Sequence, residues 1–362
     1  MKWISTVSTC VFLTYAATSA KAGELRLYSW EAYFGSDSIE KFQAETGNKV
    51  TYDVFDSNDV VETRILAGNS GYDVITPNLS PHLARQIPLG AWGELDKSLL
   101  TNIANLDPEL MAKVAEADPG NVHAVPWMWG TTGVGHNGDM IKAIMQDAPV
   151  DSFRMVFDPA IAVKFKDCGI SMLDDAEQVL GSALIYLGLD PDTQSADDLQ
   201  KAVDVIIKVR PYIRQFHGSN YIAGLAAGDL CVALGYSGDM QVATNRAKEA
   251  GKTFSIEYRL PNEGNLVWFD TLAIPSDAPD KATALAFINF VMRPEIAAKA
   301  ANETGFTTAN KAALPLIDEA IRTNVNFYPT PEAQIKFHLP KVKAIKEDKL
   351  WQRAWNRAKG IE

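Results

Sequence analysis

The amino-acid sequence predicts an α/β protein of two lobes, each a mainly parallel sheet flanked by helices, with a ligand cleft between the lobes. Three observations lead to this prediction. A chain of 362 residues is too long for one ordinary hydrophobic core. A hydrophobic content of 47% excludes a disordered chain. Strand and helix patterns alternate along the sequence, as they do in parallel sheets with crossover helices.

The first 22 residues are predicted to be a secretory signal peptide and are left out of the fold. Lys2 gives a positive start, an apolar stretch follows as far as Leu13, and the sequence Ala-Lys-Ala at 20–22 is an A-x-A cleavage signal. The apolar stretch is too short to anchor in a bilayer, and no later segment approaches 18 uninterrupted apolar residues. We therefore expect an exported, soluble and monomeric product.

The elements after residue 23 follow a regular order. Strands are expected at 25–30, 49–55 and 72–77, and helices at 36–45 and 56–67. Such a compact alternation argues for a parallel sheet with crossover helices. Sheets of this kind bind ligands beyond the carboxyl ends of their strands, which is where Trp30 and the loop at 78–80 fall.

The second part of the chain is expected to cross between two lobes more than once. The segment 125–137 is apolar, contains glycines and lacks a helical period, so it is interpreted as a strand that leaves one lobe for the other. Its aromatic group at 127–129 is interpreted as hinge packing. Further helices are expected at 174–187, 196–209, 219–227, 239–250 and 280–292, with strands at 230–236 and 266–274 and an amphipathic basic end at 341–357. After residue 305, only helices and loops are expected.

These crossings predict discontinuous lobes. The first lobe is expected to contain 23–130 and 258–303, and the second 131–257 and 304–362. Without the two lysines of the signal peptide, the formal charge falls from −11 to −13. An acidic exported protein is a poor candidate for binding nucleic acid or anionic membranes and a fair one for a cationic ligand. This combination is typical of a hinge-bending solute receptor.

Two local patterns indicate where a cationic ligand binds. Trp268 and Asp270 lie two residues apart in a strand, so a flat ring and a carboxylate face the same space, as an ammonium ligand requires. The run Gly-Tyr-Ser-Gly-Asp at 235–239 places Tyr236 at the lip of a sheet and Asp239 at a helix start. The alternatives are a packed Trp beside an Asp in the first case and a simple N-cap Asp in the second.

The common catalytic and metal motifs are missing from the sequence. The residues around Ser237 do not match the nucleophile elbow G-x-S-x-G, and the glycine-rich run at 130–133 lacks the lysine of a phosphate-binding loop. The five histidines stand singly, without zinc-ligand spacing. Cys168 and Cys231 are most simply a disulfide in an oxidising compartment, and a catalytic thiol is the alternative. We expect no metal, no cofactor and no enzymatic activity.

Several segments taken in order resemble one known family. They are 28–33 (Tyr-Ser-Trp-Glu-Ala-Tyr), 52–58 (Tyr-Asp-Val-Phe-Asp-Ser-Asn), 71–74 (Gly-Tyr-Asp-Val), 126–133 (Pro-Trp-Met-Trp-Gly-Thr-Thr-Gly), 235–239 and 268–270 (Trp-Phe-Asp). Over nearly all of the mature chain, the sequence resembles the periplasmic putrescine/spermidine-binding proteins of bacterial ABC importers. The resemblance implies a two-lobed type II solute receptor in the periplasm that closes on a polyamine and delivers it to a membrane permease.

The resemblance also implies a set of binding residues. Trp30 and Tyr33 correspond to aromatic walls and Asp239 and Asp270 to ammonium-anchoring carboxylates, while the two cysteines correspond to a disulfide of putrescine-type members. The ligand-binding residues carried over are Trp30, Glu31, Tyr33, Ser80, Asp175, Gln178, Tyr236, Asp239, Trp268, Asp270 and Phe306.

Departures from the putrescine-type pattern concern the spacing of the carboxylates. Gln178 replaces a glutamate, Glu31 replaces a small hydroxyl residue and Phe306 replaces a tyrosine, while Trp268 and Asp175 resemble spermidine-preferring members. We therefore expect spermidine or a similar triamine to be preferred over putrescine. Two alternatives remain: an exported enzyme acting on a small amine or sugar, and a receptor of the same fold that signals through a membrane sensor protein.

Overall fold

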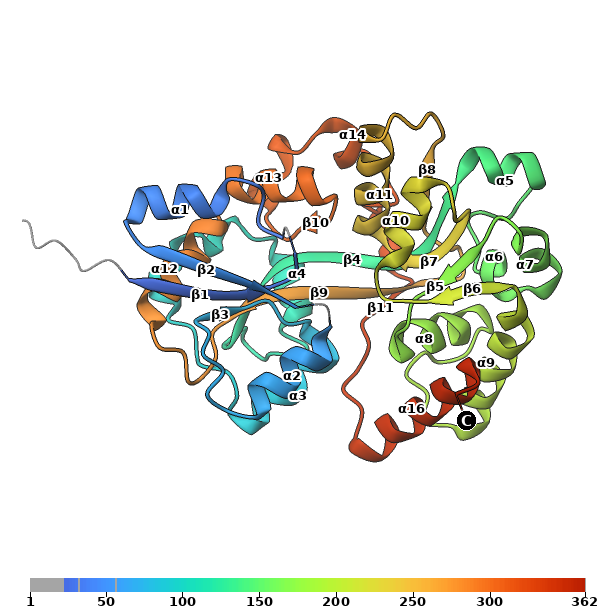
Figure 1. The fold of residues 1–362 in the computed structure, drawn as a ribbon. Helices are drawn as coiled ribbons and strands as arrows, with labels where there is room; N and C mark the ends of the chain where they lie inside the picture. Colours follow the sequence, from blue (N-terminus) through green and yellow to red (C-terminus); the bar gives the residue numbers. More distant parts are fainter. Residues whose placement is uncertain (1–22, 32, 56, 362) are drawn as a thin grey trace, which may run out of the picture.

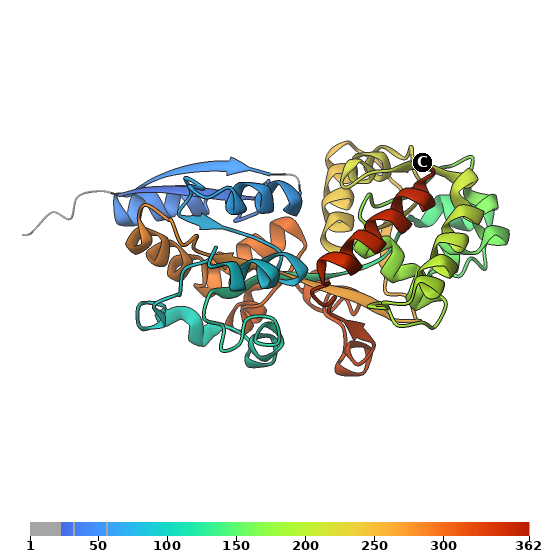
Figure 2. The same cartoon turned by 90° about the horizontal axis from the view of Figure 1, so that it is seen from below.

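The computed structural model describes residues 23–31, 33–55 and 57–361, so the predicted signal peptide lies outside the described residues. Two groups of helices and strands lie side by side and are joined by long strands (Figures 1 and 2). This mixed α/β architecture of two lobes confirms the predicted fold class. Within the described residues, no helix is long and apolar enough to cross a membrane.

The first lobe begins with the predicted alternation of strands and helices. Its elements are β1 (Glu24–Ser29), α1 (Ser38–Thr46), β2 (Lys49–Val54), α2 (Asn58–Leu66) and β3 (Val74–Ile75). Strand β1 lies between β2 and β3 and is parallel to both. Helix α1 ends at Gly47, whose φ of 74° is a left-handed conformation that favours glycine, and Ser57 caps α2. Trp30 therefore follows the carboxyl end of the central strand.

Strands β4 (Ala124–Asn137) and β9 (Asn265–Ala273) carry the chain between the lobes, as Figure 1 shows. They are antiparallel, and Met128 pairs with Asp270 and Gly130 with Trp268. Every residue of both strands is buried, which explains why their sequences are mostly apolar and show no alternation with exposed polar residues. Within the described residues, the pair joins the strands into one sheet with the main order β2-β1-β3-β9-β4-β7-β5-β6, and β8, β10 and β11 pair with β4 or β9 beside this path. The sequence did not predict this continuity.

The second lobe contains a second parallel part of this sheet. Strand β5 (Ile170–Met172) lies between β6 (Ile213–Phe216) and β7 (Val232–Tyr236) and is parallel to both, while β7 and β8 (Ile256–Arg259) pair antiparallel with β4. The helices of this lobe and its approaches are α5 (Gly138–Ile144), α6 (Arg154–Phe157), α7 (Pro159–Phe165), α8 (Ala176–Tyr186), α9 (Ala196–Val209), α10 (Asn220–Ala227) and α11 (Ser237–Glu249).

The remaining helices lie outside these two runs. They are α3 (Ala84–Gln86), α4 (Pro108–Val114), α12 (Lys281–Val291), α13 (Pro294–Thr304), α14 (Glu319–Arg322), α15 (Pro331–Gln334) and α16 (Ile345–Lys359). Short helical turns η1 to η6 occupy Leu79–Leu83, Ile87–Leu89, Lys97–Leu99, Thr101–Asn105, Arg210–Tyr212 and Lys311–Leu316. Ser80 belongs to η1, directly after the loop that leaves β3.

The end of the chain differs from the sequence prediction. Strand β10 (Thr307–Thr308) pairs with β4, and β11 (Phe337–His338) pairs with β9. The expectation of only helices and loops after residue 305 was therefore wrong, because two-residue strands leave no alternating pattern to read. Ala313, Ile317 and Ile321 pack into the first-lobe core, which differs from the assignment of 304–362 to the second lobe. The other lobe boundaries remain predictions.

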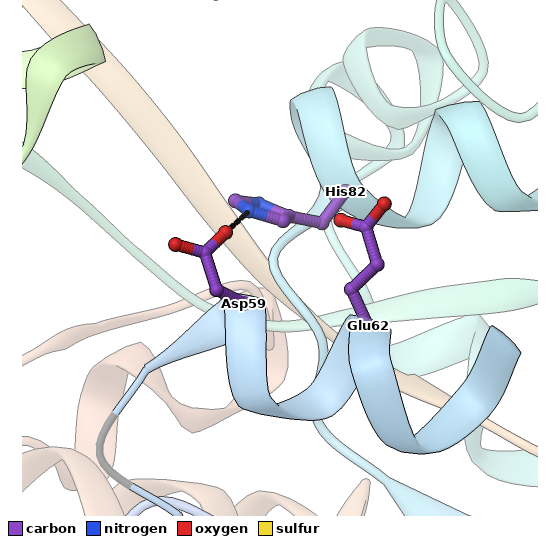
Figure 3. Close-up of side chains that lie close together, drawn as sticks. All are labelled: Asp59, Glu62 and His82. Atoms are coloured by element: carbon purple, nitrogen blue, oxygen red, sulfur yellow. Dashed lines mark ion pairs between the residues drawn. The ribbon is translucent and has the colours of Figure 1, made fainter. Parts of the chain in front are cut away.

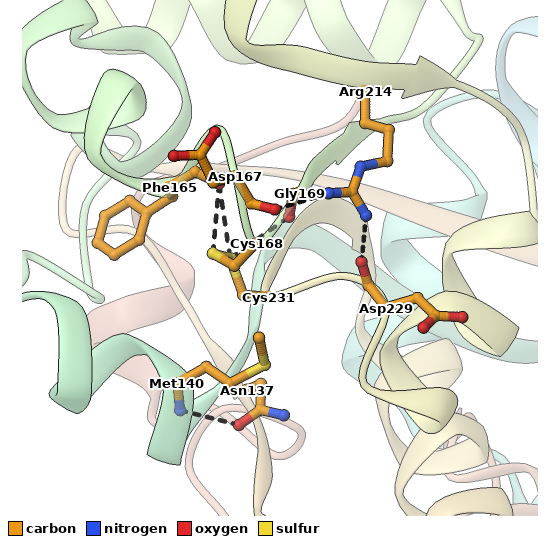
Figure 4. Close-up of a disulfide and its surroundings, with 9 residues drawn as sticks. All are labelled: Asn137, Met140, Phe165, Asp167, Cys168, Gly169, Arg214, Asp229 and Cys231. Carbon is orange, nitrogen blue, oxygen red and sulfur yellow. Dashed lines mark hydrogen bonds between the residues drawn. A yellow bond between two sulfur atoms is a disulfide. The ribbon is translucent and has the colours of Figure 1, made fainter.

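Cys168 and Cys231 form a disulfide with a Cα–Cα distance of 5.6 Å (Figure 4). The bond joins the end of the α7 region to the start of β7, across 63 residues of sequence. A loop of that length corresponds to roughly 4 kcal/mol of lost unfolded-state entropy. Because both sulfur atoms are in the bond, the alternative of a catalytic thiol is wrong.

Candidate ligand-binding site

Most of the residues predicted to bind ligand gather where β4 and β9 pass between the lobes. Trp268 and Asp270 lie on β9 opposite Gly130 and Met128 of β4. Tyr236 ends β7, which pairs with β4 at Thr132. Since β4 contacts both strands, the side chains of the two lobes meet at this crossing.

Four aromatic rings form a continuous row across the crossing. Tyr33 and Phe306 have ring centroids 5.7 Å apart, Phe306 and Trp268 5.4 Å, and Trp268 and Tyr236 5.7 Å. All three contacts are edge-to-face, with interplanar angles of 72°, 79° and 82°. We call these four residues the aromatic row. It extends from a first-lobe residue to a second-lobe residue, and both ends carry a phenol hydroxyl.

Glycines allow the rings to approach the backbone this closely. A Cβ atom on Gly130 would overlap the ring of Trp268, and one on Gly238 would overlap the ring of Phe306. Gly130 lies in the strand that joins the lobes and Gly238 in the first turn of α11. The packing of the aromatic row therefore explains why both segments contain glycine at these positions.

Asp270 is buried at the Tyr33 end of the aromatic row. The hydroxyl of Tyr33 donates a hydrogen bond to Asp270 Oδ2 at 2.7 Å, and the residue Asp270 is 6% exposed. Burial raises the pKa of Asp270 to about 7, although hydrogen bonds from Tyr33 and Asn78 oppose the shift. Burial and the neighbouring carboxylate hold the pKa of Tyr33 well above its usual value. Asp270 is thus a carboxyl group that a cation would ionise at neutral pH.

Asp239 is the third residue of α11 and is partly buried. Tyr236 occupies the N-cap position, so the alternative interpretation of Asp239 as an N-cap was wrong. The hydroxyl of Tyr221 donates a hydrogen bond to Asp239 Oδ2 and accepts one from the Tyr236 backbone N–H at 3.1 Å. Burial raises the pKa of Asp239 to about 6. The helix start holds this carboxylate close to the Tyr236 end of the aromatic row.

Asp175 and Gln178 belong to the first turn of α8. Asp175 caps the helix by accepting a hydrogen bond from the Gln178 N–H at 3.0 Å, and its carboxylate lies beside the Tyr236 hydroxyl, whose pKa it helps to raise. Burial raises the pKa of Asp175. The side-chain oxygen of Gln178 accepts a hydrogen bond from the Thr132 hydroxyl at 2.6 Å. The side-chain oxygen of Gln178 is therefore already used by Thr132, whereas a glutamate at this position would have a second carboxylate oxygen for a ligand.

The other predicted residues lie at the margin of the aromatic row. Trp30 packs edge-on against Phe55, with ring centroids 4.4 Å apart, and its side chain lies close enough to Asp270 to oppose the rise in the pKa of that carboxyl, whereas Glu31 is exposed. Ser80 is buried, and its hydroxyl donates to the backbone oxygen of Pro340 at 2.5 Å. Ser80 can therefore accept but not donate a hydrogen bond towards a ligand without releasing that contact.

Sequence reasoning missed several residues that surround the carboxylates. Asn78 donates to the Phe269 backbone oxygen at 3.3 Å and also contributes to holding Asp270, and Tyr221 holds Asp239. His82 lies near both Asp175 and Asp270, so a positive charge on it would lower the pKa of these two carboxyl groups. None of these carries a motif, so only the adjacency of Asn78 to the predicted loop offered a signal.

One group of side chains has the composition of a metal site. Asp59 and Glu62 of α2 point towards His82 of η1 (Figure 3). His82 Nε2 lies 3.6 Å from Asp59, and Glu62 is already paired with Arg85. Asp59 is 87% exposed. A metal ion would compete with the Arg85 guanidinium for Glu62, so this geometry favours a surface ion-pair network.

Comparisons with known proteins identify the family. The model of the family described as bacterial extracellular solute-binding protein matches residues 37–329. The chain is 46% identical over 344 residues to the putrescine-binding periplasmic protein SpuD of Pseudomonas aeruginosa (strain UCBPP-PA14), covering 95% of this chain and 94% of the relative. It is 42% identical over 362 residues to the putrescine-binding periplasmic protein PotF of Escherichia coli (strain K12), with 99% and 98% covered.

Solved structures agree with this assignment. The crystal structure of the spermidine/putrescine ABC transporter substrate-binding protein PotD from Streptococcus pneumoniae superposes with a TM-score of 0.79 at 26% identity, covering 94% of this chain and 99% of that one. The resemblance to polyamine-binding proteins of ABC importers is thereby confirmed. The chain belongs to the bacterial extracellular solute-binding proteins, a family of transport receptors and not of enzymes.

Proposed function

We propose that this protein is a periplasmic receptor that binds a polyamine and delivers it to an ABC permease. The aromatic row with carboxylates near both ends is the observation that supports the proposal. Asp270 contacts Tyr33 at one end, and Asp175 and Asp239 lie near Tyr236 at the other. A polyamine is a chain of methylenes with ammonium groups, so rings suit its methylenes and carboxylates its ammonium groups.

The same residues suggest how binding is coupled to lobe closure. In the empty protein, burial makes the charged forms of Asp270 and Asp239 unfavourable. An ammonium group restores the ionised state by supplying the opposite charge. Because Asp270 lies on β9 and Asp239 on α11 of the other lobe, a ligand that contacts both stabilises the arrangement in which the lobes approach. The hinge is proposed to lie near residues 130 and 258, at the predicted lobe boundaries.

The proposed ligand is spermidine or a similar triamine, preferred over putrescine. The names of SpuD and PotF favour putrescine, whereas PotD of Streptococcus pneumoniae is named for both polyamines. The preference for a triamine rests on Asp175, which adds a third carboxylate, and on Gln178, whose oxygen is bound to Thr132. The proposed contacts are those of Trp30, Glu31, Tyr33, Ser80, Asp175, Gln178, Tyr236, Asp239, Trp268, Asp270 and Phe306.

Calorimetric titration of the refolded, ligand-free protein tests both parts of the proposal. Putrescine, cadaverine, spermidine and norspermidine are compared at pH 8, with a monoamine of similar length as the negative control. We expect binding of polyamines alone, with the triamines at least about tenfold tighter than the diamines, or about 1.4 kcal/mol. Tighter binding of putrescine than of the triamines would contradict the proposed triamine preference. Equally tight binding of the monoamine would contradict the proposal that the protein is a polyamine receptor.

The destination of the ligand needs a cellular test. Uptake of labelled polyamine is measured in cells with and without the gene. Loss of uptake on deletion supports delivery to a permease, whereas unchanged uptake with a lost transcriptional response to polyamine supports the sensor alternative.

A further inference from the structure

A segment near the end of the chain contacts both lobes beside the proposed site. We call residues 336–343 the strap. Its His338 belongs to β11 and pairs with Leu266 of β9, the strand that carries Trp268 and Asp270. Its Pro340 backbone oxygen accepts the hydrogen bond from Ser80 of the first lobe. Figure 1 shows β11 beside β9, with α16 following the strap at the second lobe.

The strap ends in a lysine whose ammonium group is buried. The Lys343 side chain is 8% exposed, and its Nζ lies 2.6 and 2.8 Å from the two carboxylate oxygens of Glu177. Asp192 Oδ1 is 3.6 Å away, and the Trp351 ring centroid 4.1 Å away. We call Glu177, Asp192 and Trp351 the ammonium box. A cation held between carboxylates and an aromatic face is also the arrangement proposed for the ligand.

The walls of the ammonium box are themselves fixed by hydrogen bonds. Asp192 accepts from the Lys341 N–H at 3.1 Å and lies 2.7 Å from His338 Nε2, so the strap binds it twice more. The Trp351 indole N–H donates to the Thr193 backbone oxygen at 3.2 Å. Lys343 therefore enters a box whose carboxylate and ring are already oriented.

The ammonium box is connected directly to the ligand site through α8. Glu177 is the second residue of this helix, and Asp175 is its N-cap. Burial raises the pKa of Glu177 to about 7, the Lys343 ammonium group opposes this shift, and the nearby Asp175 carboxylate adds to it. Holding Glu177 fixes the first turn of α8 and with it the position of Asp175.

We propose that Lys343 is a positioning residue for the ligand site, acting through Glu177 on Asp175 and favouring longer polyamines. This inference rests on the proposed function. Asp175 lies beside Tyr236, whereas Asp270 is bonded to Tyr33, so these carboxylates serve opposite ends of the aromatic row. A triamine carries one more ammonium group than a diamine, so it can engage Asp175 in addition to Asp239 and Asp270. Loss of the Lys343 contact would displace the carboxylate that this additional ammonium group engages.

The experiment compares full-length mature protein with Lys343→Met by calorimetric titration with putrescine and spermidine. Lys341→Met is the matched control, because Lys341 is an exposed lysine of the same strap that uses its backbone N–H for Asp192. The double variant Glu177→Gln, Lys343→Met removes the charge of Glu177 together with that of Lys343, while Asp192 keeps its contacts with His338 and the Lys341 N–H, so it retains folding if the single variant does not. Thermal melts of the empty proteins confirm that each variant is folded.

We expect Lys343→Met and the double variant to lose at least about tenfold in spermidine affinity and less than about threefold in putrescine affinity. Lys341→Met should keep the wild-type ratio of the two affinities. If Lys343 has only a structural role, Lys343→Met will lower the affinity for both ligands equally or will lower the melting temperature alone. Either result overturns the proposal. Failure of the wild-type protein to bind any polyamine overturns the proposed function, and this is read from the wild-type titration before any variant is compared.

Discussion

The hydroxyl of Tyr33 donates a hydrogen bond to Asp270 across 237 residues of sequence, at 2.7 Å. Both side chains are buried, and Tyr33 also touches Phe306 in the aromatic row. The contact orients one carboxylate oxygen of Asp270. It also stabilises the ionised form of Asp270 in surroundings that otherwise disfavour charge.

Replacing Tyr33 with Phe should weaken polyamine binding by about tenfold near pH 7, or about 1.4 kcal/mol. The ring and its contacts remain, while Asp270 loses a donor that favours its charged form. Titration calorimetry measures the effect. Tyr212→Phe is the control, because Tyr212 lies away from the aromatic row in η5. An unchanged affinity in Tyr33→Phe would show that the hydroxyl does not support the binding carboxylate.

Ligand affinity should depend on pH through Asp270 and Asp239. Their pKa values are raised to about 7 and about 6 in the empty protein, and a bound ammonium group favours the ionised forms. Affinity is therefore expected to be constant near pH 8. It should fall by about tenfold per pH unit once one group is protonated, and more steeply below pH 6 when both are. Calorimetry at pH 8, 7, 6 and 5 tests this, and a flat profile would contradict it.

The stability of the empty protein should respond to pH with the opposite sign. Because the folded-state pKa of Asp270 lies above the unfolded value of about 3.9, the folded state binds the proton more tightly. Its contribution to stability is therefore present at low pH and is lost as the pH rises from about 4 to about 7. Other groups titrate in the same range, so the measurement is the difference in unfolding free energy between wild type and Asp270→Asn. That difference should grow in favour of the variant as the pH rises.

Replacing Asp239 with Asn should raise the dissociation constant for polyamines by between about 10-fold and 100-fold, since one charge-assisted contact is lost. The asparagine oxygen still accepts the hydrogen bond from Tyr221, so the fold should persist. The melting temperature of the empty variant should be equal to or above that of the wild type, because a buried charge is removed. Asp229→Asn, at an exposed position, is the control. A lower melting temperature with unchanged affinity would assign Asp239 a structural role only.

The parts of the site that follow from local spacing could be predicted from the sequence. Trp268 and Asp270 share a strand face because side chains alternate along a strand. Tyr236 ends a strand and Asp239 starts a helix because a glycine-rich turn separates an apolar run from an amphipathic one. The fold class followed from the same periodicities.

The parts that depend on contacts distant in sequence could not be predicted from local patterns. The Ser80 hydroxyl is occupied by Pro340, 260 residues away, which no local pattern records. The order of the aromatic row depends on where Phe306 lies after α13, and this follows from the packing of both lobes. The two-residue strands β10 and β11 form because β4 and β9 offer free edges, and their own sequences carry no strand signal.

Replacing Gly130 with Ala should damage the crossing between the lobes. The new methyl group would overlap the Trp268 ring and also approach the Ser237 hydroxyl, so either the ring leaves the aromatic row or β4 shifts against β9. Overpacking of this kind costs about 1–3 kcal/mol of stability, and a displaced Trp268 should weaken binding of every polyamine by at least about tenfold.

The matched control is Gly218→Ala, since nothing lies within 4 Å of a Cβ atom at that glycine and its backbone conformation suits alanine. Thermal melts and titrations with spermidine compare both variants with the wild type. Gly218→Ala should leave the melting temperature and the affinity unchanged or raise the melting temperature slightly, because alanine reduces the entropy of the unfolded chain. Wild-type affinity in Gly130→Ala would mean that the Trp268 ring can move without loss of binding, and the aromatic row would then not be the surface that contacts the ligand.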